Sequence, residues 1–206
     1  MRMVMLLKTI RAFRPQPVSW QVVCCVLFLG GMLGSVHAQS TTVASPNAAY
    51  SRPEVVGLGG VMSTAPVRLR VWGFEVYDAR LWTPQGFRHS QYTQFPFALE
   101  LQYLRRLEGA AIASRSIDEM RRVGSFSDAQ AQSWLAAMRD LFPNVSQGER
   151  ITGINLPGVG AEFWVNGQRV GLIKDVVFAR LFFGIWLDER TSEPKMRAQL
   201  LQGLQP

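Results

Sequence analysis

The feature that most constrains the fold is an apolar run near the end of the chain. From Val176 to Leu187 the sequence VVFARLFFGIWL contains one charged residue, Arg180. A membrane-spanning helix needs about 20 consecutive apolar residues, and this run ends at Asp188. We therefore predict a buried helix of a folded domain, covered on most sides. In that helix Gly184 leaves room for a close neighbour, either protein or ligand.

A second apolar run lies near the N-terminus and resembles a secretory signal peptide in the order of its parts. The basic residues Arg2, Lys8, Arg11 and Arg14 precede the apolar stretch 18–33, and small residues follow. That order predicts a signal peptide over residues 1–38, cleaved after Ala38. The remainder would then be periplasmic or secreted. The alternative is an uncleaved N-terminal anchor, which would be the expected membrane contact.

Removing this leader changes the bulk composition. Both cysteines, Cys24 and Cys25, lie inside it, so no disulfide framework is expected. Four of the 22 basic residues also lie in the leader, which leaves 18 against 15 acidic residues and a net charge of +3. This modest excess is not concentrated in a run, so no nucleic-acid partner is predicted.

Residues 39–53 are small and polar and predict a flexible tether, which leaves residues 54–206 for a single domain. Alternating and helical patterns divide that domain in turn. Strands are expected over 54–63, 67–82, 95–104 and 149–173, with helices over 108–124, 127–144, 174–190 and 193–203. The dipeptide Asn166-Gly167 predicts a β-hairpin turn. This order indicates an α+β fold with helices on one face of a mostly antiparallel sheet.

Residue types that carry common chemistries are scarce in the predicted domain. His89 is its one histidine and lies in a turn-like segment, where a surface residue is expected rather than an oriented base. The domain sequence lacks cysteine and has no glycine-rich phosphate loop. We therefore predict no metal and no cofactor.

The remaining candidates are arginines and tyrosines near strand ends. They are Arg68, Arg70, Tyr77, Tyr103 and Arg106, and Arg105 adjoins the last of them. A guanidinium beside a phenol inside the domain would make a carboxylate clamp at the mouth of an apolar cavity. The alternative is that the arginines lie on a solvated face and pair with Glu75, Asp78 or Glu108.

Four segments together resemble the bacterial secreted proteins with a chalcone isomerase-like domain. They are VRLRVWGFEVYDARLW, FALELQYLRR, GERITGINLPGVGAEFWVNGQRVGLI and FARLFFGIWLDERTSEPKMRAQLLQ. The resemblance covers about residues 54–203. It implies an open-faced β-sandwich, a large antiparallel sheet with helices on one face and a ligand cleft between the layers.

The resemblance also implies two activities. Plant members cyclise a chalcone with an arginine, a threonine, and a tyrosine and asparagine on the first helix, and no cofactor. Non-catalytic members bind fatty acids, with arginine and tyrosine at the carboxylate. Here Arg68 (or Arg70) matches the arginine and Tyr77 stands at the threonine position, while the first helix lacks both tyrosine and asparagine.

We therefore predict an exported, non-catalytic binding protein for a fatty acid or similar apolar carboxylate. The alternatives are an intramolecular lyase acting on a phenolic or polyketide-like substrate, and a ligand-free structural domain. An acyl site needs a cavity of about 300 Å³ or more, which separates the last alternative from the other two.

Overall fold

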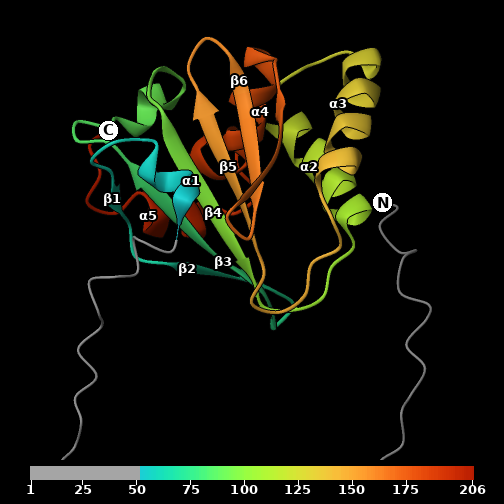
Figure 1. Cartoon of the computed structure of the whole chain (residues 1–206), viewed down its shortest axis with the longest axis horizontal. Helices are drawn as coiled ribbons and strands as arrows, with labels where there is room; N and C mark the ends of the chain where they lie inside the picture. Colours follow the sequence, from blue (N-terminus) through green and yellow to red (C-terminus); the bar gives the residue numbers. More distant parts are fainter. Residues whose placement is uncertain (1–51) are drawn as a thin grey trace, which may run out of the picture. The chain divides into compact units, whose positions relative to one another are not determined.

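A computed structural model describes residues 52–206 of the chain (Figure 1). The predicted signal peptide and residues 39–51 of the predicted tether lie outside the described residues. Within residues 52–206, no helix is both long enough and apolar enough to cross a bilayer.

Seven strands form one antiparallel sheet (Figure 1). They are β1 (Met62–Ser63), β2 (Val67–Val71), β3 (Phe74–Thr83), β4 (Phe97–Tyr103), β5 (Arg150–Leu156), β6 (Gly160–Val165) and β7 (Gln168–Ile173). The sheet order is β1-β3-β4-β5-β6-β7, and β2 pairs with the other part of the β3 edge. The predicted α+β class with a large antiparallel sheet is confirmed.

One face of this sheet is covered by helices. They are α2 (Gly109–Val123), α3 (Asp128–Leu141), α4 (Val176–Leu187) and α5 (Pro194–Leu200). Helix α4 contacts β6 and α2, α3 contacts β7, and α5 contacts β2 and β3. A 3-10 segment, η2 (His89–Gln94), also contacts α4. Side chains from both layers form one large apolar core.

Helix α4 is the apolar run from which the fold prediction began, and it is buried as predicted. Its N-cap, Asp175, accepts hydrogen bonds from the backbone of Val177 and Phe178 and from the indole of Trp134. A Cβ added at Gly184 would lie 2.5 Å from Val123 of α2. The close neighbour that glycine admits is therefore a side chain of the adjacent helix.

The sequence patterns also locate the other helices well. Ser127 and Gln130 form a capping box at the start of α3, within the predicted range 127–144. In the predicted range 193–203, Glu193 is the N-cap of α5 and Pro194 its first residue. Ahead of this helix, the Thr191 hydroxyl donates to the Ile185 carbonyl and accepts from the Glu193 amide.

The predicted strand over 54–63 is wrong except at its end, where Met62–Ser63 form β1. Residues Pro53–Val56 form a single helical turn, α1, with proline in its first turn, where a missing N–H costs nothing. This turn lies on the face of the sheet opposite the large core, where Val55 packs with Trp82, Ala98 and Ile154. The domain thus also covers a small part of its outer face.

Buried charges reinforce that outer contact. Arg52 forms a two-pronged ion pair with Glu100 of β4, and its guanidinium lies 5.4 Å from the Trp82 ring centroid. Glu54 accepts a hydrogen bond from Thr152 and lies 3.6 Å from Arg150. Both carboxylates are almost fully buried, so the ion pairs are needed to offset their desolvation.

Candidate functional site

The candidate site is a cavity of about 340 Å³ between the sheet and helices α2, α4 and α5. Its walls are mainly aliphatic and aromatic. They include Leu69 and Val71 of β2, Leu101 of β4, Ile151 of β5, Ile112 of α2, Phe182 and Ile185 of α4, and Met196 of α5. The volume falls within the range of small-molecule sites. Because the walls are mainly apolar, water in the cavity makes few hydrogen bonds with them. An apolar molecule of suitable size could therefore displace this water at little cost.

Two tyrosines of the sheet supply polar groups to this cavity. Tyr77 of β3 and Tyr103 of β4 are direct partners across the two strands, with ring centroids 6.1 Å apart. Trp186 of α4 donates its indole N–H to the Tyr77 hydroxyl oxygen over 3.0 Å. Within residues 52–206 the Tyr77 hydroxyl makes no other hydrogen bond, so its proton is available to a ligand.

Burial keeps both tyrosines protonated. Desolvation raises the pKa of Tyr77 well above its usual range; the hydrogen bond from Trp186 lowers it, and the negative charges of Glu193 and Glu119 raise it further. Desolvation also raises the pKa of Tyr103, and the neighbouring Tyr77 adds to this. Both phenols are therefore hydrogen-bond donors across the physiological range, and neither is suited to act as a base.

Charged groups line the cavity from α2 and from the start of α5. Arg115 and Glu119 of α2 lie one turn apart, with Arg115 Nη2 2.5 Å from Glu119 Oε1, and Glu193 adjoins α5. Arg115 is mostly exposed, whereas Glu119 is buried. The pair is in ionic contact, but Glu119 Oε1 has no well-aligned hydrogen-bond donor among the described residues. Arg115 is therefore a cation with a weakly oriented partner.

Helical spacing explains why α2 presents these groups together. Ile112, Arg115, Ser116 and Glu119 recur every three or four residues and share one face of the helix. That face lines the cavity, while Ala113, Ile117 and Met120 enter the core. The tyrosine and asparagine that a chalcone isomerase would supply from this helix are absent from that face.

Two of the predicted site residues, Arg68 and Arg70, lie elsewhere. Successive strand residues face opposite sides, so Val67 and Leu69 face the core and Arg68 faces solvent. Arg68 pairs with Asp78 and Glu75, and Arg70 pairs with Glu75. The expectation of an inward guanidinium on this strand is corrected. The structure has the solvated, ion-paired arrangement that was its alternative.

The remaining predicted residues divide in the same way. Tyr77 and Tyr103 line the cavity, while Arg106 is exposed in the segment between β4 and α2 and does not line it. The sequence analysis did not identify Arg115, Glu119 or Trp186. Ile112, Arg115 and Glu119 are spaced by three and four residues. This helical spacing was the sequence pattern from which Arg115 and Glu119 could have been placed on one face of the helix.

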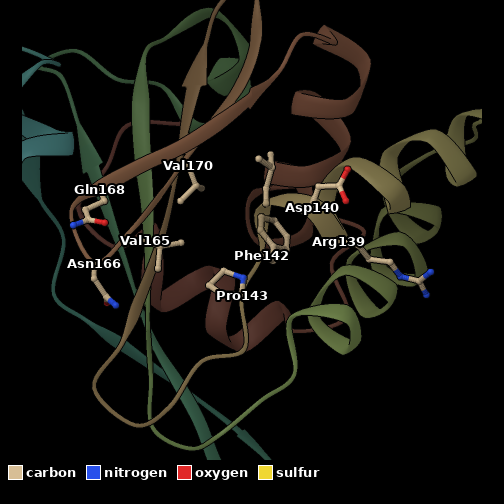
Figure 2. Close-up of a pocket in the computed structure, with 9 residues that line it drawn as sticks. Arg139, Asp140, Phe142, Pro143, Val165, Asn166, Gln168 and Val170 are labelled. Atoms are coloured by element: carbon tan, nitrogen blue, oxygen red, sulfur yellow. The ribbon is translucent and has the colours of Figure 1, made fainter.

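A second, open hollow of about 570 Å³ lies between the end of α3 and the β6–β7 edge (Figure 2). Figure 2 shows Arg139 extending away from the other labelled side chains. Asn166 is already engaged in turn hydrogen bonds with Arg150 and Glu149. None of the described lining residues has a buried polar atom without a partner. Although larger, this hollow has fewer groups prepared for a ligand than the inner cavity has.

Comparison with known proteins agrees with this architecture of an antiparallel sheet with helices on one face. A family model described as chalcone isomerase-like matches residues 61–202. The chain belongs to this chalcone isomerase-like family.

Two individual proteins are similar to the chain. An uncharacterized protein of Haemophilus influenzae is 32% identical over 131 residues, which are 63% of this chain and 63% of that protein. The chain thus spans less than two thirds of that relative's length. The crystal structure of a fatty-acid binding protein of Arabidopsis thaliana, AtFAP1, matches with a TM-score of 0.51 and 16% identity. The match covers 70% of this chain and 85% of that one, and it supports the fold.

Proposed function

We propose that this protein is an exported, non-catalytic binding protein for a fatty acid or a similar single-chain apolar carboxylate. The observation that carries the proposal is the apolar cavity of about 340 Å³, which has Tyr77, Tyr103 and Arg115 among its lining residues. The fatty-acid binding of the structural neighbour supports the same ligand class. The signal-peptide pattern of residues 1–38 supports export to the periplasm or beyond.

In this proposal the carboxylate of the ligand is not held by an arginine of β2, contrary to the sequence prediction. The Tyr77 hydroxyl accepts from Trp186 and has its own proton free for a carboxylate oxygen. Arg115 supplies the charge, after turning away from Glu119. The buried Glu119 would keep a second cation in this exchange, because Arg122 Nε lies 3.6 Å from Glu119 Oε2.

The first experiment blocks the cavity. Ser116 of α2 lines it, and its hydroxyl donates to the carbonyl four residues earlier. Ser114 makes the same backbone hydrogen bond but does not line the cavity. Ser116→Leu should abolish saturable binding of oleic acid by delipidated protein in isothermal titration calorimetry, whereas Ser114→Leu should bind as the wild type does. Equal binding by both variants would remove the cavity as the site.

The second experiment tests the head group with two opposite changes. Arg115→Gln removes the proposed cation and should weaken oleic acid binding about tenfold, while Glu119→Gln removes its competitor and should tighten binding. Oleyl alcohol, which lacks the charge, should respond to neither change. If the acid and the alcohol respond alike, Arg115 does not hold the carboxylate.

A further inference from the structure

The tip of the β2–β3 hairpin exposes two aromatic side chains that are separated in the sequence by one glycine. Trp72 is 79% exposed, the highest value among the large apolar residues in 52–206, and Phe74 is 63% exposed. Val71, before them, is 40% exposed. Apolar surface of this extent at one point is typical of a surface that contacts another molecule or a membrane.

Backbone conformation indicates that Trp72 is not there to form the turn. The register pairs Val71 with Phe74, so Trp72 and Gly73 are the two turn residues. Both have positive φ angles, 50° and 83°. Glycine and asparagine adopt such angles readily, whereas a bulky side chain is strained there. A strained residue held outward in solvent points to a role outside the fold.

The hairpin extends past the ladder between β3 and β4. Paired residues begin at Tyr77 and Tyr103, and the Leu104 amide still donates to the Val76 carbonyl, so Phe74 and Glu75 lie beyond the last backbone contact with β4 and the residue after it. Two strand residues correspond to about 7 Å. Trp72 and Gly73 lie at the end of this extension, where Trp72 is exposed to a flat surface.

The charge beside the tip is positive. Arg105 and Arg106 are exposed in the segment that follows β4, and the Arg105 guanidinium lies 5.4 Å from the Phe74 ring centroid. Within the described part of the chain, neither arginine forms an ion pair. The positive charges of Arg68 and Arg70 are offset by the carboxylates of Glu75 and Asp78, with which they form ion pairs.

We propose that this tip docks the protein on a bilayer surface that contains anionic phospholipids. Trp72 and Phe74 enter the boundary between headgroups and acyl chains, where aromatic rings are favoured. Arg105 and Arg106 lie against the lipid phosphates. This docking goes beyond the proposed ligand binding and does not depend on it.

The tip lies next to the cavity wall in the sequence, which suggests a function for docking. Leu69 and Val71 of β2 and Val76 of β3 line the cavity, and they flank the exposed pair in the sequence. A docked hairpin thus places the cavity wall next to the membrane. An apolar ligand would pass between bilayer and cavity with little exposure to water.

The test measures binding to vesicles. The full chain, and in parallel the chain from Gln39, would be sedimented with vesicles of phosphatidylcholine alone or with about a third phosphatidylglycerol. The shorter chain keeps both apolar clusters, which lie within residues 55–204. Wild type should bind the anionic vesicles in a salt-sensitive manner. Trp72→Ala/Phe74→Ala and Arg105→Ala/Arg106→Ala should each bind at least about tenfold more weakly.

Two matched controls separate docking from general charge or hydrophobicity. Arg88, in the β3–β4 connection, and Lys174, after β7, are exposed cations at the end of the sheet opposite the tip, and neither forms an ion pair within residues 52–206. Val159 is an exposed apolar residue in the β5–β6 turn, at the same end of the sheet. Arg88→Ala/Lys174→Ala and Val159→Ser should bind vesicles as the wild type does.

Three outcomes would overturn the proposal. In the first, the wild-type chain from Gln39 fails to bind anionic vesicles. In the second, Trp72→Ala/Phe74→Ala binds them as well as wild type does. In the third, sedimentation velocity without lipid would show a wild-type dimer that Trp72→Ala/Phe74→Ala dissociates, which would make the tip an interface between two copies. Thermal unfolding of each variant confirms that the comparison concerns folded protein.

Discussion

The β2–β3 and β6–β7 hairpins have the same two-residue turn but opposite relations to the rest of the molecule. Both turns place a non-glycine residue with φ near 50° before a glycine with φ of 83°. In β6–β7 that residue is Asn166, whose side chain accepts from the Arg150 amide and donates to Glu149. In β2–β3 it is Trp72, whose side chain is mostly solvent-exposed.

The difference distinguishes a turn residue that the fold explains from a turn residue that the fold does not explain. Asn166 suits its backbone angle and contributes hydrogen bonds to the sheet, so the fold alone accounts for it. Trp72 strains the same angle and gains little burial in return. Where local preference and observed residue disagree in this way, function outside the fold is the usual reason.

The largest effect should come from replacing the turn glycines. Gly73→Ala should cost about 1 kcal/mol, the strain of an ordinary residue at positive φ. Gly167→Ala should cost about 2 kcal/mol, because its Cβ would also lie 3.3 Å from Pro53 of α1. Urea unfolding of both variants measures the difference. Equal losses of unfolding free energy in the two variants would mean that the contact with Pro53 adds no cost at Gly167.

An intermediate effect, of opposite sign, is expected at Trp72. Trp72→Asn should raise the free energy of unfolding by about 0.5–1 kcal/mol, because asparagine tolerates the left-handed conformation. Phe74→Asn is the matched control, since Phe74 is exposed but does not have a positive φ. A loss of stability in Trp72→Asn would mean that the indole stabilises the turn by contacts in the folded state.

The smallest effect concerns acid stability of the β2–β3 hairpin. Hydrogen bonding by Arg68 lowers the pKa of Asp78, and Arg68 followed by Arg70 lowers the pKa of Glu75. A lowered carboxyl pKa stabilises the fold above about pH 4, and this contribution is lost as pH falls through the folded-state value. The melting-temperature gap between wild type and Asp78→Asn should therefore narrow below pH 4. If the gap widens below pH 4, the ionised Asp78 carboxylate does not stabilise the folded state.

The sequence predicted regular elements where local chemistry was strong. Asn166-Gly167 identified its hairpin directly, and Ser127 with Gln130 identified the start of α3. The single strand predicted over 67–82 is instead two strands, β2 and β3, joined by the turn Trp72-Gly73, which the sequence did not reveal because tryptophan is not a turn-forming residue. Residues 54–56 were predicted as part of a strand, but Pro53 and the outer-face packing of Val55 select a helical turn.

The candidate site was half predictable. Strand alternation from Phe97 placed Tyr103 inward, and cross-strand pairing then brings Tyr77 beside it. Arg115 was missed, because a charged residue on a helix is ordinarily solvated and only the packing of α2 over the sheet brings that face to the cavity. The strand arginines attracted attention instead, although their alternation already assigned Arg68 to the solvated face.

The small outer-face contact has a practical consequence for anyone who prepares this domain. The family match begins at residue 61, nine residues after the described structure starts. A fragment trimmed to the family limits would lose Arg52 and Val55, strip the cover from Trp82 and Ile154, and leave Glu100 facing only Arg150. Apolar surface that is covered in the full domain would then be exposed and would promote aggregation, so the cloning boundary belongs ahead of Arg52.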